Sequence, residues 1–241
     1  MKIGVITQAR MTSTRLPGKV LMKIADKPLL HYHVSRIGWS GIPLYVATTV
    51  NREDDCLVSF CEERQINCFR GSEANVLERY YQCATENELD VIVRVTSDCP
   101  LIDGHLIKNA VDRYLQENDL DVYLSNYLER TYPRGVDFEV FSYRSLTDAY
   151  QNASRESHRE HVTPYINQNI SGKIRYVNMK REGDASRFRI TVDTAEDFLL
   201  LQEMIEKYGC ADMGAEAIIQ VLEGTPHLYE INAHVQQKPV E

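Results

Sequence analysis

The sequence predicts an α/β fold with a central mixed, mostly parallel sheet flanked by helices. Three apolar runs rich in β-branched residues, at 2–7, 44–48 and 91–95, are typical of short buried strands. Apolar residues also recur at helical spacing, most clearly at Leu106, Ile107, Ala110, Val111 and Tyr114. Strands that alternate with helices favour parallel pairing, with helices on both faces of the sheet.

The pattern becomes looser in the second half of the chain. We expect strands at 121–125, 137–141, 174–178 and 187–192, and helices at 142–153, 160–169, 195–207 and 214–222. Thr194 and Asp197 have the spacing of a capping box that opens the third of these helices. Because no repeat or flexible linker interrupts the sequence, we expect residues 1–241 to form a single domain, with residues 227–241 as a C-terminal arm.

Composition excludes several kinds of partner. The chain has 35 acidic residues against 27 Lys and Arg, for a net charge of −8, which disfavours a nucleic-acid surface or an anionic membrane as partner. No apolar run approaches the roughly 18 residues of a membrane span, and the first one is too short for a signal peptide. The six cysteines form no CxxC pair, so we expect reduced thiols and a cytoplasmic location.

The segment after the first strand carries the strongest chemical signal. Arg10, Arg15 and Lys19 occur there among small and turn-forming residues, without any acid. Ligands of open α/β sheets bind at the carboxyl ends of strands, and cations with exposed backbone amides suit phosphates. The segment therefore predicts a phosphate-binding loop, the alternative being a solvated basic loop. It matches neither the Walker pattern nor the GxGxxG pattern.

The run ARMTSTRLPGK at 9–19 resembles the signature of the cytidylyltransferases that make CMP-sialic acid and CMP-keto-deoxy-octulosonate, and most of all that of the spore-coat polysaccharide biosynthesis (SpsF-type) family. Further matching runs span nearly the whole chain: VAT at 46–48, FRGS at 69–72, VLERY at 76–80, RVTSDCPLI at 94–102, REHVTP at 159–164 and TVD at 191–193. Ser97 departs from the family, which usually has Gly before the aspartate. The resemblance implies a Rossmann-like (GT-A-like) nucleotidyltransferase, CTP as substrate, Mg²⁺ as cofactor and a homodimer.

The resemblance also implies roles for individual residues. It assigns the metal to Asp98 and Asp193, and catalysis to Asp98 with Arg10, Arg15 and Lys19. Both aspartates follow predicted strands, and Mg²⁺ takes few protein ligands; the alternatives are a turn role for Asp98 and a helix-entry role for Asp193. The CTP-binding residues would be Ala9, Arg10, Met11, Ser13, Arg15, Lys19, Ala47, Thr48, Arg70, Gly71 and Ser72, the alternative for residues 70–72 being a structural turn.

The acceptor is less sharply defined by the sequence. We expect Arg134, Glu139, Arg159 and His161 near a sugar, where an arginine could fork a carboxylate. The leading hypothesis is CMP transfer to a sugar acid of the nonulosonate or keto-deoxy type, for surface polysaccharide biosynthesis. Transfer to a sugar or alcohol phosphate, giving a CDP product, is an alternative. A GT-A-like glycosyltransferase would carry an Asp-x-Asp motif, which 95–102 lacks, and a silent nucleotide sensor would not need Lys19, Asp98 and Asp193 together.

Overall fold

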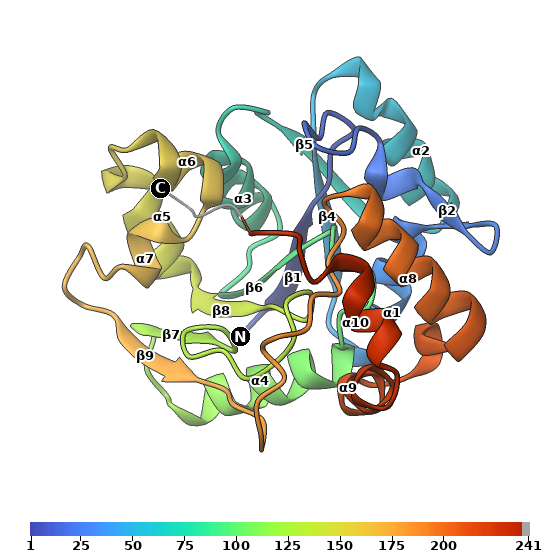
Figure 1. Ribbon diagram of the computed structural model, residues 1–241. Coiled ribbons are helices and arrows are strands. Elements are labelled where there is room, and N and C mark those ends of the chain that lie inside the picture. The colour runs from blue at the N-terminus through green and yellow to red at the C-terminus, as the bar shows by residue number, and fades with distance from the viewer. Residues whose placement is uncertain (238–241) are drawn as a thin grey trace.

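A single seven-stranded sheet forms the centre of the molecule in the computed structural model, which describes residues 1–237 (Figure 1). The strand order is β5-β4-β1-β6-β8-β7-β9, and every neighbouring pair is parallel except the two that involve β8. The mixed, mostly parallel sheet is thus confirmed. The strands are β1 (Ile3–Gln8), β4 (Leu44–Thr49), β5 (Asn67–Gly71), β6 (Val91–Thr96), β7 (Val122–Ser125), β8 (Glu139–Ser142) and β9 (Arg175–Asn178), with a separate hairpin of β2 (Lys23–Ile24) and β3 (Lys27–Pro28).

Helices cover both faces of the sheet. α3, α5 and α7 pack on one face, around Ile6 and Ile92, whereas α1 and α4 pack on the other, around Val5 and Val93. α2 lies beside α1 against Val46. The helices are α1 (Leu29–Ile37), α2 (Asp55–Glu63), α3 (Val76–Glu86), α4 (Gly104–Gln116), α5 (Tyr143–Asn152), α6 (Glu156–His161), α7 (Pro164–Asn167), α8 (Ala195–Tyr208), α9 (Ala215–Gly224) and α10 (Pro226–Asn232).

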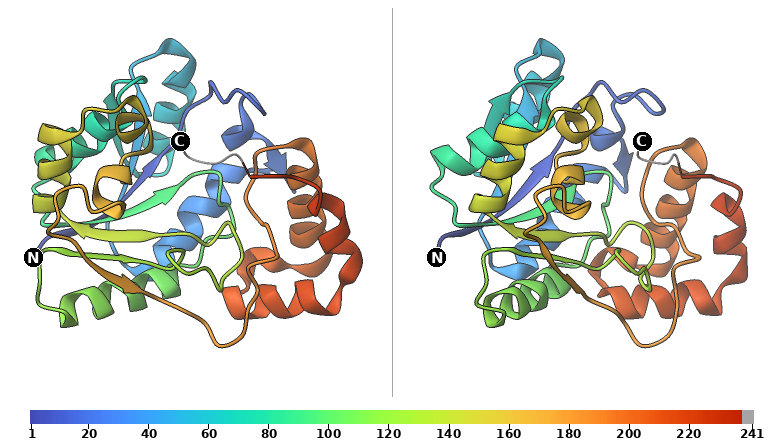
Figure 2. Two further views of the ribbon diagram at one scale, coloured as in Figure 1. Left: turned by 60° about the vertical axis from the view of Figure 1, so that its left-hand side comes forward. Right: turned by 90° about the vertical axis from the view of Figure 1, so that its left-hand side faces the viewer.

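The last three helices form a group of their own, on the side of the sheet away from α5, α6 and α7 (Figures 1 and 2). Their apolar residues bury a core with Leu29 and Tyr32 of α1. Thr194 and Asp197 form the predicted capping box at the start of α8. The predicted arm begins as α10, whose Leu228 is fully buried; residues 238–241 of that arm lie outside the described residues.

The structure differs from two of the predicted elements, the strand at 187–192 and the helix at 160–169. Residues 187–192 are not a strand, because Arg187 lies in a turn and the extended stretch 188–192 makes only one isolated bridge, from Arg189 to Arg134. The predicted helix at 160–169 is two short helices, because Val162 has a φ of 69° and Pro164 begins the second helix. Helix α2 and strand β5 were not predicted.

No helix among the described residues has the length and apolar character that crossing a membrane requires.

Gly135 sets the path of the extended segment. Its φ is +113°, and a Cβ atom there would lie 2.6 Å from the carbonyl carbon of Ile190. The neighbouring residue Arg134 holds the two backbones together here, because its N–H donates to the carbonyl of Phe188 and its carbonyl accepts from the N–H of Ile190. The close backbone approach therefore needs a residue without a side chain.

We predict that Gly135→Ala lowers the free energy of unfolding by on the order of 3 kcal/mol, through backbone strain and overpacking together. Gly172→Ala is the matched control, because its φ is +72° but nothing lies within 4 Å of the added Cβ. It should cost only the strain, roughly 1–2 kcal/mol. Urea unfolding of both variants makes the comparison, and equal losses would show that the approach to Ile190 is not tight.

Candidate active site

The basic loop leaves the carboxyl end of β1 and is closed on itself. The N–H of Gly18 donates to the carbonyl of Met11 over 2.9 Å, and Gly18 adopts the left-handed φ of 70° that suits glycine. The N–H of Met11 donates to the buried carboxylate of Asp54 over 2.7 Å. Glu73 accepts hydrogen bonds from Arg10 and Thr12. The loop is therefore held in place by two acidic side chains, Asp54 and Glu73.

A cleft of about 620 Å³ lies between this loop, α3, α6 and the carboxyl end of β6, a size usual for small-molecule sites. Because β1 and β6 run parallel, their carboxyl ends meet at this edge of the sheet. The lining residues are Gln8, Ala9, Arg10, Ser13, Thr14, Arg15, Lys19, Val20, Glu73, Ala74, Val76, Arg79, Thr96, Ser97, Asp98, Glu156, Glu160, His161 and Asp193.

Asp98 and Asp193 converge on one cation, the Lys19 ammonium group. Its Nζ lies 3.3 Å from Asp98 Oδ2 and 2.9 Å from Asp193 Oδ1, and donates to the carbonyl of Val192 over 2.6 Å. The N–H of Val192 donates in turn to the carbonyl of Asp98 over 2.8 Å. These contacts bring two aspartates that are far apart in the sequence to a single point.

The pKa values reflect this pairing. Burial alone would raise the pKa of the Asp98 carboxyl, but the Lys19 charge and the hydrogen bonds from Thr96, Lys19 and Cys99 together outweigh it and lower that pKa to about 2. Burial alone would lower the pKa of Lys19, yet Asp98 and Asp193 together raise it above the ordinary value of 10.5. Both groups are therefore charged throughout the physiological pH range.

The oxygen donors at this point fit a hard divalent cation. Two carboxylates already surround the Lys19 ammonium, which stands where a positive charge is stabilised. No group of three or more His, Cys, Asp or Glu residues within 1–237 is arranged to hold a metal. An ion here would accordingly take two protein carboxylates and complete its shell with water and substrate oxygens, as Mg²⁺ commonly does.

Of the predicted nucleotide-binding residues, the structure brings five to the cleft lining: Ala9, Arg10, Ser13, Arg15 and Lys19. Met11, Ala47, Thr48, Arg70, Gly71 and Ser72 are not among the lining residues. Arg70 instead donates to the carbonyls of Thr49 and Asn51 over 2.8 Å each and pairs with Asp55. Its side chain thus supports the turn after β4.

Of the predicted acceptor residues, only His161 lines the cleft. Glu139 is buried, and its carboxylate pairs with Arg94 and accepts from Tyr123. Arg134 is half-buried beside the extended segment, and Arg159 is exposed on α6. The expected convergence of Arg134, Glu139 and Arg159 at the cleft is not observed.

Arg79 is a cleft residue to which the sequence reasoning assigned no role. It is 2% exposed, has no ion-pair partner among the described residues, and leaves Nε without a hydrogen bond. Its Nη1 donates to the carbonyl of Ser72 over 3.0 Å. Burial lowers its pKa. The available signal was a charged side chain on the apolar face of the predicted helix, between Val76 and Tyr80.

We predict that Asp98→Asn removes a pH-dependent part of the stability. The pKa of Asp98 falls from 3.8 to about 2 on folding, so its contribution is complete above pH 3.8 and is lost as the pH falls toward 2. The loss of unfolding free energy in the variant should therefore shrink over that window. In a Lys19→Met background the loss above pH 3.8 should be smaller, because the stabilising charge is absent. Equal losses in both backgrounds would contradict the pairing.

Comparison with known proteins finds relatives that match nearly the whole chain. An uncharacterized protein of Methanocaldococcus jannaschii is 38% identical to the chain, with 99% of the chain and 97% of the relative covered. The spore coat polysaccharide biosynthesis protein SpsF of Bacillus subtilis is 31% identical, with coverage of 92% and 94%. The structure of a cytidylyltransferase from Leptospira borgpetersenii superposes with a TM-score of 0.90 at 32% identity, covering 99% of each chain.

The last of these confirms the Rossmann-like nucleotidyltransferase fold over the full sheet and its helices. A family model described as cytidylyltransferase matches residues 4–238, which is nearly the whole chain. The chain therefore belongs to the cytidylyltransferase family.

Proposed function

We propose that the protein transfers CMP from CTP to a hydroxyl group of a sugar acid, of the nonulosonate or keto-deoxy type, and releases pyrophosphate. The observation that carries the proposal is the convergence of Asp98 and Asp193 on Lys19, inside a cleft that the basic loop lines. Membership of the cytidylyltransferase family supports CMP as the group that is transferred. The name of the Bacillus subtilis relative supports a role in surface polysaccharide biosynthesis.

In this reaction the acceptor oxygen bonds to the α-phosphorus of CTP while the bond to the pyrophosphate oxygen breaks. Lys19, Arg15 and Arg10 would neutralise the charge that develops on the leaving pyrophosphate. Asp98 and Asp193 would hold Mg²⁺, which would supply positive charge at the reacting phosphate. Lys19 must exchange its carboxylate partners for phosphate oxygens when the nucleotide binds.

Arg79 is the fourth cation of the cleft lining and adjoins Ser72. A buried arginine with unused donor capacity suits an acceptor-rich ligand, so we assign Arg79 to the nucleotide. The acceptor sugar would then lie toward α6, where Glu156, Glu160 and His161 offer polar groups to its hydroxyls. Burial lowers the pKa of His161, which favours the neutral imidazole.

A phosphate acceptor would need further cations at that end of the cleft, but Arg134 and Arg159 do not line it.

The family resemblance alone supports a homodimer, which we propose together with a cytoplasmic location.

The direct test is pyrophosphate release from each of CTP, ATP, GTP and UTP, with Mg²⁺, against panels of sugar acids and sugar phosphates. We expect turnover with CTP and a sugar acid. Lys19→Ala should lower the rate by on the order of 100-fold or more, because a charge on the leaving group is lost. Lys23→Ala is the control, because Lys23 is exposed four residues further on and does not line the cleft; its rate should be that of the wild type. Preference for another nucleotide, or equal rates for the two variants, would contradict the proposal.

A further inference from the structure

The Asp193 carboxylate is paired with three cationic side chains, more than a role as a metal ligand requires. Its Oδ1 accepts from Lys19 over 2.9 Å, whereas its Oδ2 accepts from Arg189 over 2.7 Å and forms an ion pair with Arg15 at 2.9 Å. Arg15 and Lys19 line the cleft and can reach a ligand, but Arg189 does not line it and is only 8% exposed. One of the three cations is therefore a permanent partner of Asp193.

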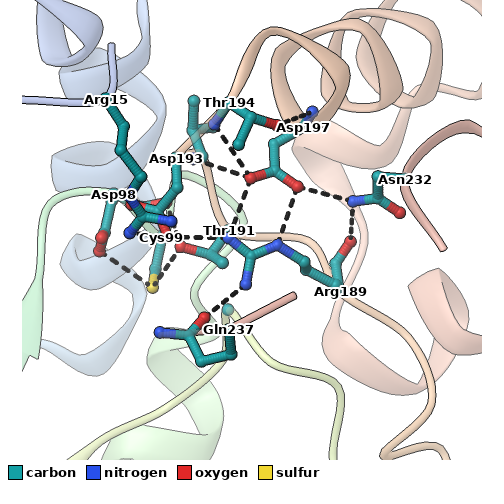
Figure 3. Close-up of polar contacts among 12 residues, drawn as sticks. Arg15, Asp98, Cys99, Arg189, Thr191, Asp193, Thr194, Asp197, Asn232 and Gln237 are labelled. Carbon is teal, nitrogen blue, oxygen red and sulfur yellow. Dashed lines mark hydrogen bonds and ion pairs between the residues drawn. The ribbon is translucent and has the colours of Figure 1, made fainter. Parts of the chain in front are cut away.

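Arg189 is held in place from several elements (Figure 3). Its Nε and Nη2 both donate to the carboxylate of Asp197 over 2.9 Å, and its Nη1 donates to Gln237 over 2.6 Å. The amide of Asn232 donates to the carbonyl of Arg189 and to Asp197 over 3.0 and 2.8 Å. The guanidinium group thus has little freedom to move.

Asp197 extends the same restraint to the backbone. It is fully buried and accepts from the backbone N–H of Asp193 over 2.9 Å, in addition to capping α8. The main chain and one carboxylate oxygen of Asp193 are consequently held by the same Arg189–Asp197 pair. Within residues 1–237, the second oxygen, Oδ1, is paired with Lys19 alone.

We propose that Arg189 is a positioning residue, which gives the two carboxylate oxygens of Asp193 different roles. Oδ2 stays bound to Arg189, while Oδ1 exchanges Lys19 for the incoming cation when the nucleotide binds. Arg189 also leaves Arg15 free to move to the triphosphate, since Asp193 keeps a counter-ion after Arg15 departs. The inference rests on the proposed function of this site.

The physical reason is the balance of charge in the cluster. Asp98, Asp193 and Asp197 pair with Lys19, Arg15 and Arg189, so this cluster has three carboxylates and three cations. A triphosphate that draws away Lys19 and Arg15 would leave Asp193 without a partner if Arg189 were absent. An unpaired buried carboxylate is costly, so the variant enzyme would retain Arg15 on Asp193 instead.

The test uses Arg189→Lys, because a single ammonium group cannot fork Asp197 and also reach Asp193, so that Asp193 Oδ2 loses its fixed counter-ion. Two quantities are measured: the dissociation constant of CTP in EDTA, and the Mg²⁺ concentration that gives half-maximal turnover. We expect the first to rise several-fold, because Arg15 is retained by Asp193, and the second to rise about 10- to 100-fold, as on loss of groups that orient metal ligands. Arg187→Lys is the control, since Arg187 is exposed two residues away, and should change neither quantity.

A double variant makes the first readout specific. When Arg15→Ala is already present, adding Arg189→Lys should not weaken metal-free CTP binding further, because the two act through the same contact. Gln237→Ala provides a second, milder variant if Arg189→Lys fails to fold, and should shift both quantities in the same direction.

Two results would overturn the inference. If Arg189→Lys lowers the melting temperature but leaves both quantities unchanged, Arg189 only stabilises the entry to α8. If the effects of Arg15→Ala and Arg189→Lys on metal-free binding are additive, the two residues do not share Asp193. Failure of the proposed function is a separate outcome, in which the wild-type protein itself neither binds nor consumes CTP.

Discussion

The ion cluster of Lys19, Asp98 and Asp193 joins three parts of the chain: the loop after β1, the turn after β6 and the segment before α8. Removing paired charges from water costs much of what their attraction returns, and apolar replacements are often no less stable. The cluster is therefore poorly explained as a device for stability. It fits the proposed function better, in which two carboxylates hold the Lys19 ammonium group in place until a triphosphate competes for it.

The extended segment that ends at Asp193 depends on contacts outside the sheet. Its backbone bonds to Arg134 and Asp98 rather than to a neighbouring strand. Because Gly135 allows the two backbones to approach, the segment can run between the helices α8 to α10 and the carboxyl edge of the sheet. The C-terminal helices thereby determine where Asp193 lies, although they contribute no side chain to the cleft lining.

The sequence predicted the sheet, the basic loop and the position of Asp98, because each depends on local pattern and on the rule that parallel strands share a carboxyl edge. Asp193 was predicted beside them on the resemblance, although the strand expected before it does not form. The sequence predicted 187–192 as a strand, since an apolar extended run looks the same whether it pairs with a sheet or with loops. It could not show that the guanidinium of Arg70 is already occupied by Thr49, Asn51 and Asp55. Arg189 was missed because the contacts that hold it beside Asp193 come from Asp197 of α8, Asn232 of α10 and Gln237 beyond α10.

The central claim is that a triphosphate takes Lys19 from the two aspartates, which then hold the metal. A crystal structure with Mn²⁺ and a CTP analogue that cannot be cleaved between the α- and β-phosphates tests it most directly, because Mn²⁺ is located by its anomalous scattering. We predict one Mn²⁺ between Asp98 and Asp193, with the Lys19 ammonium on phosphate oxygens. A structure in which Lys19 still bridges the two aspartates, while the analogue and Mn²⁺ bind elsewhere, would contradict the account.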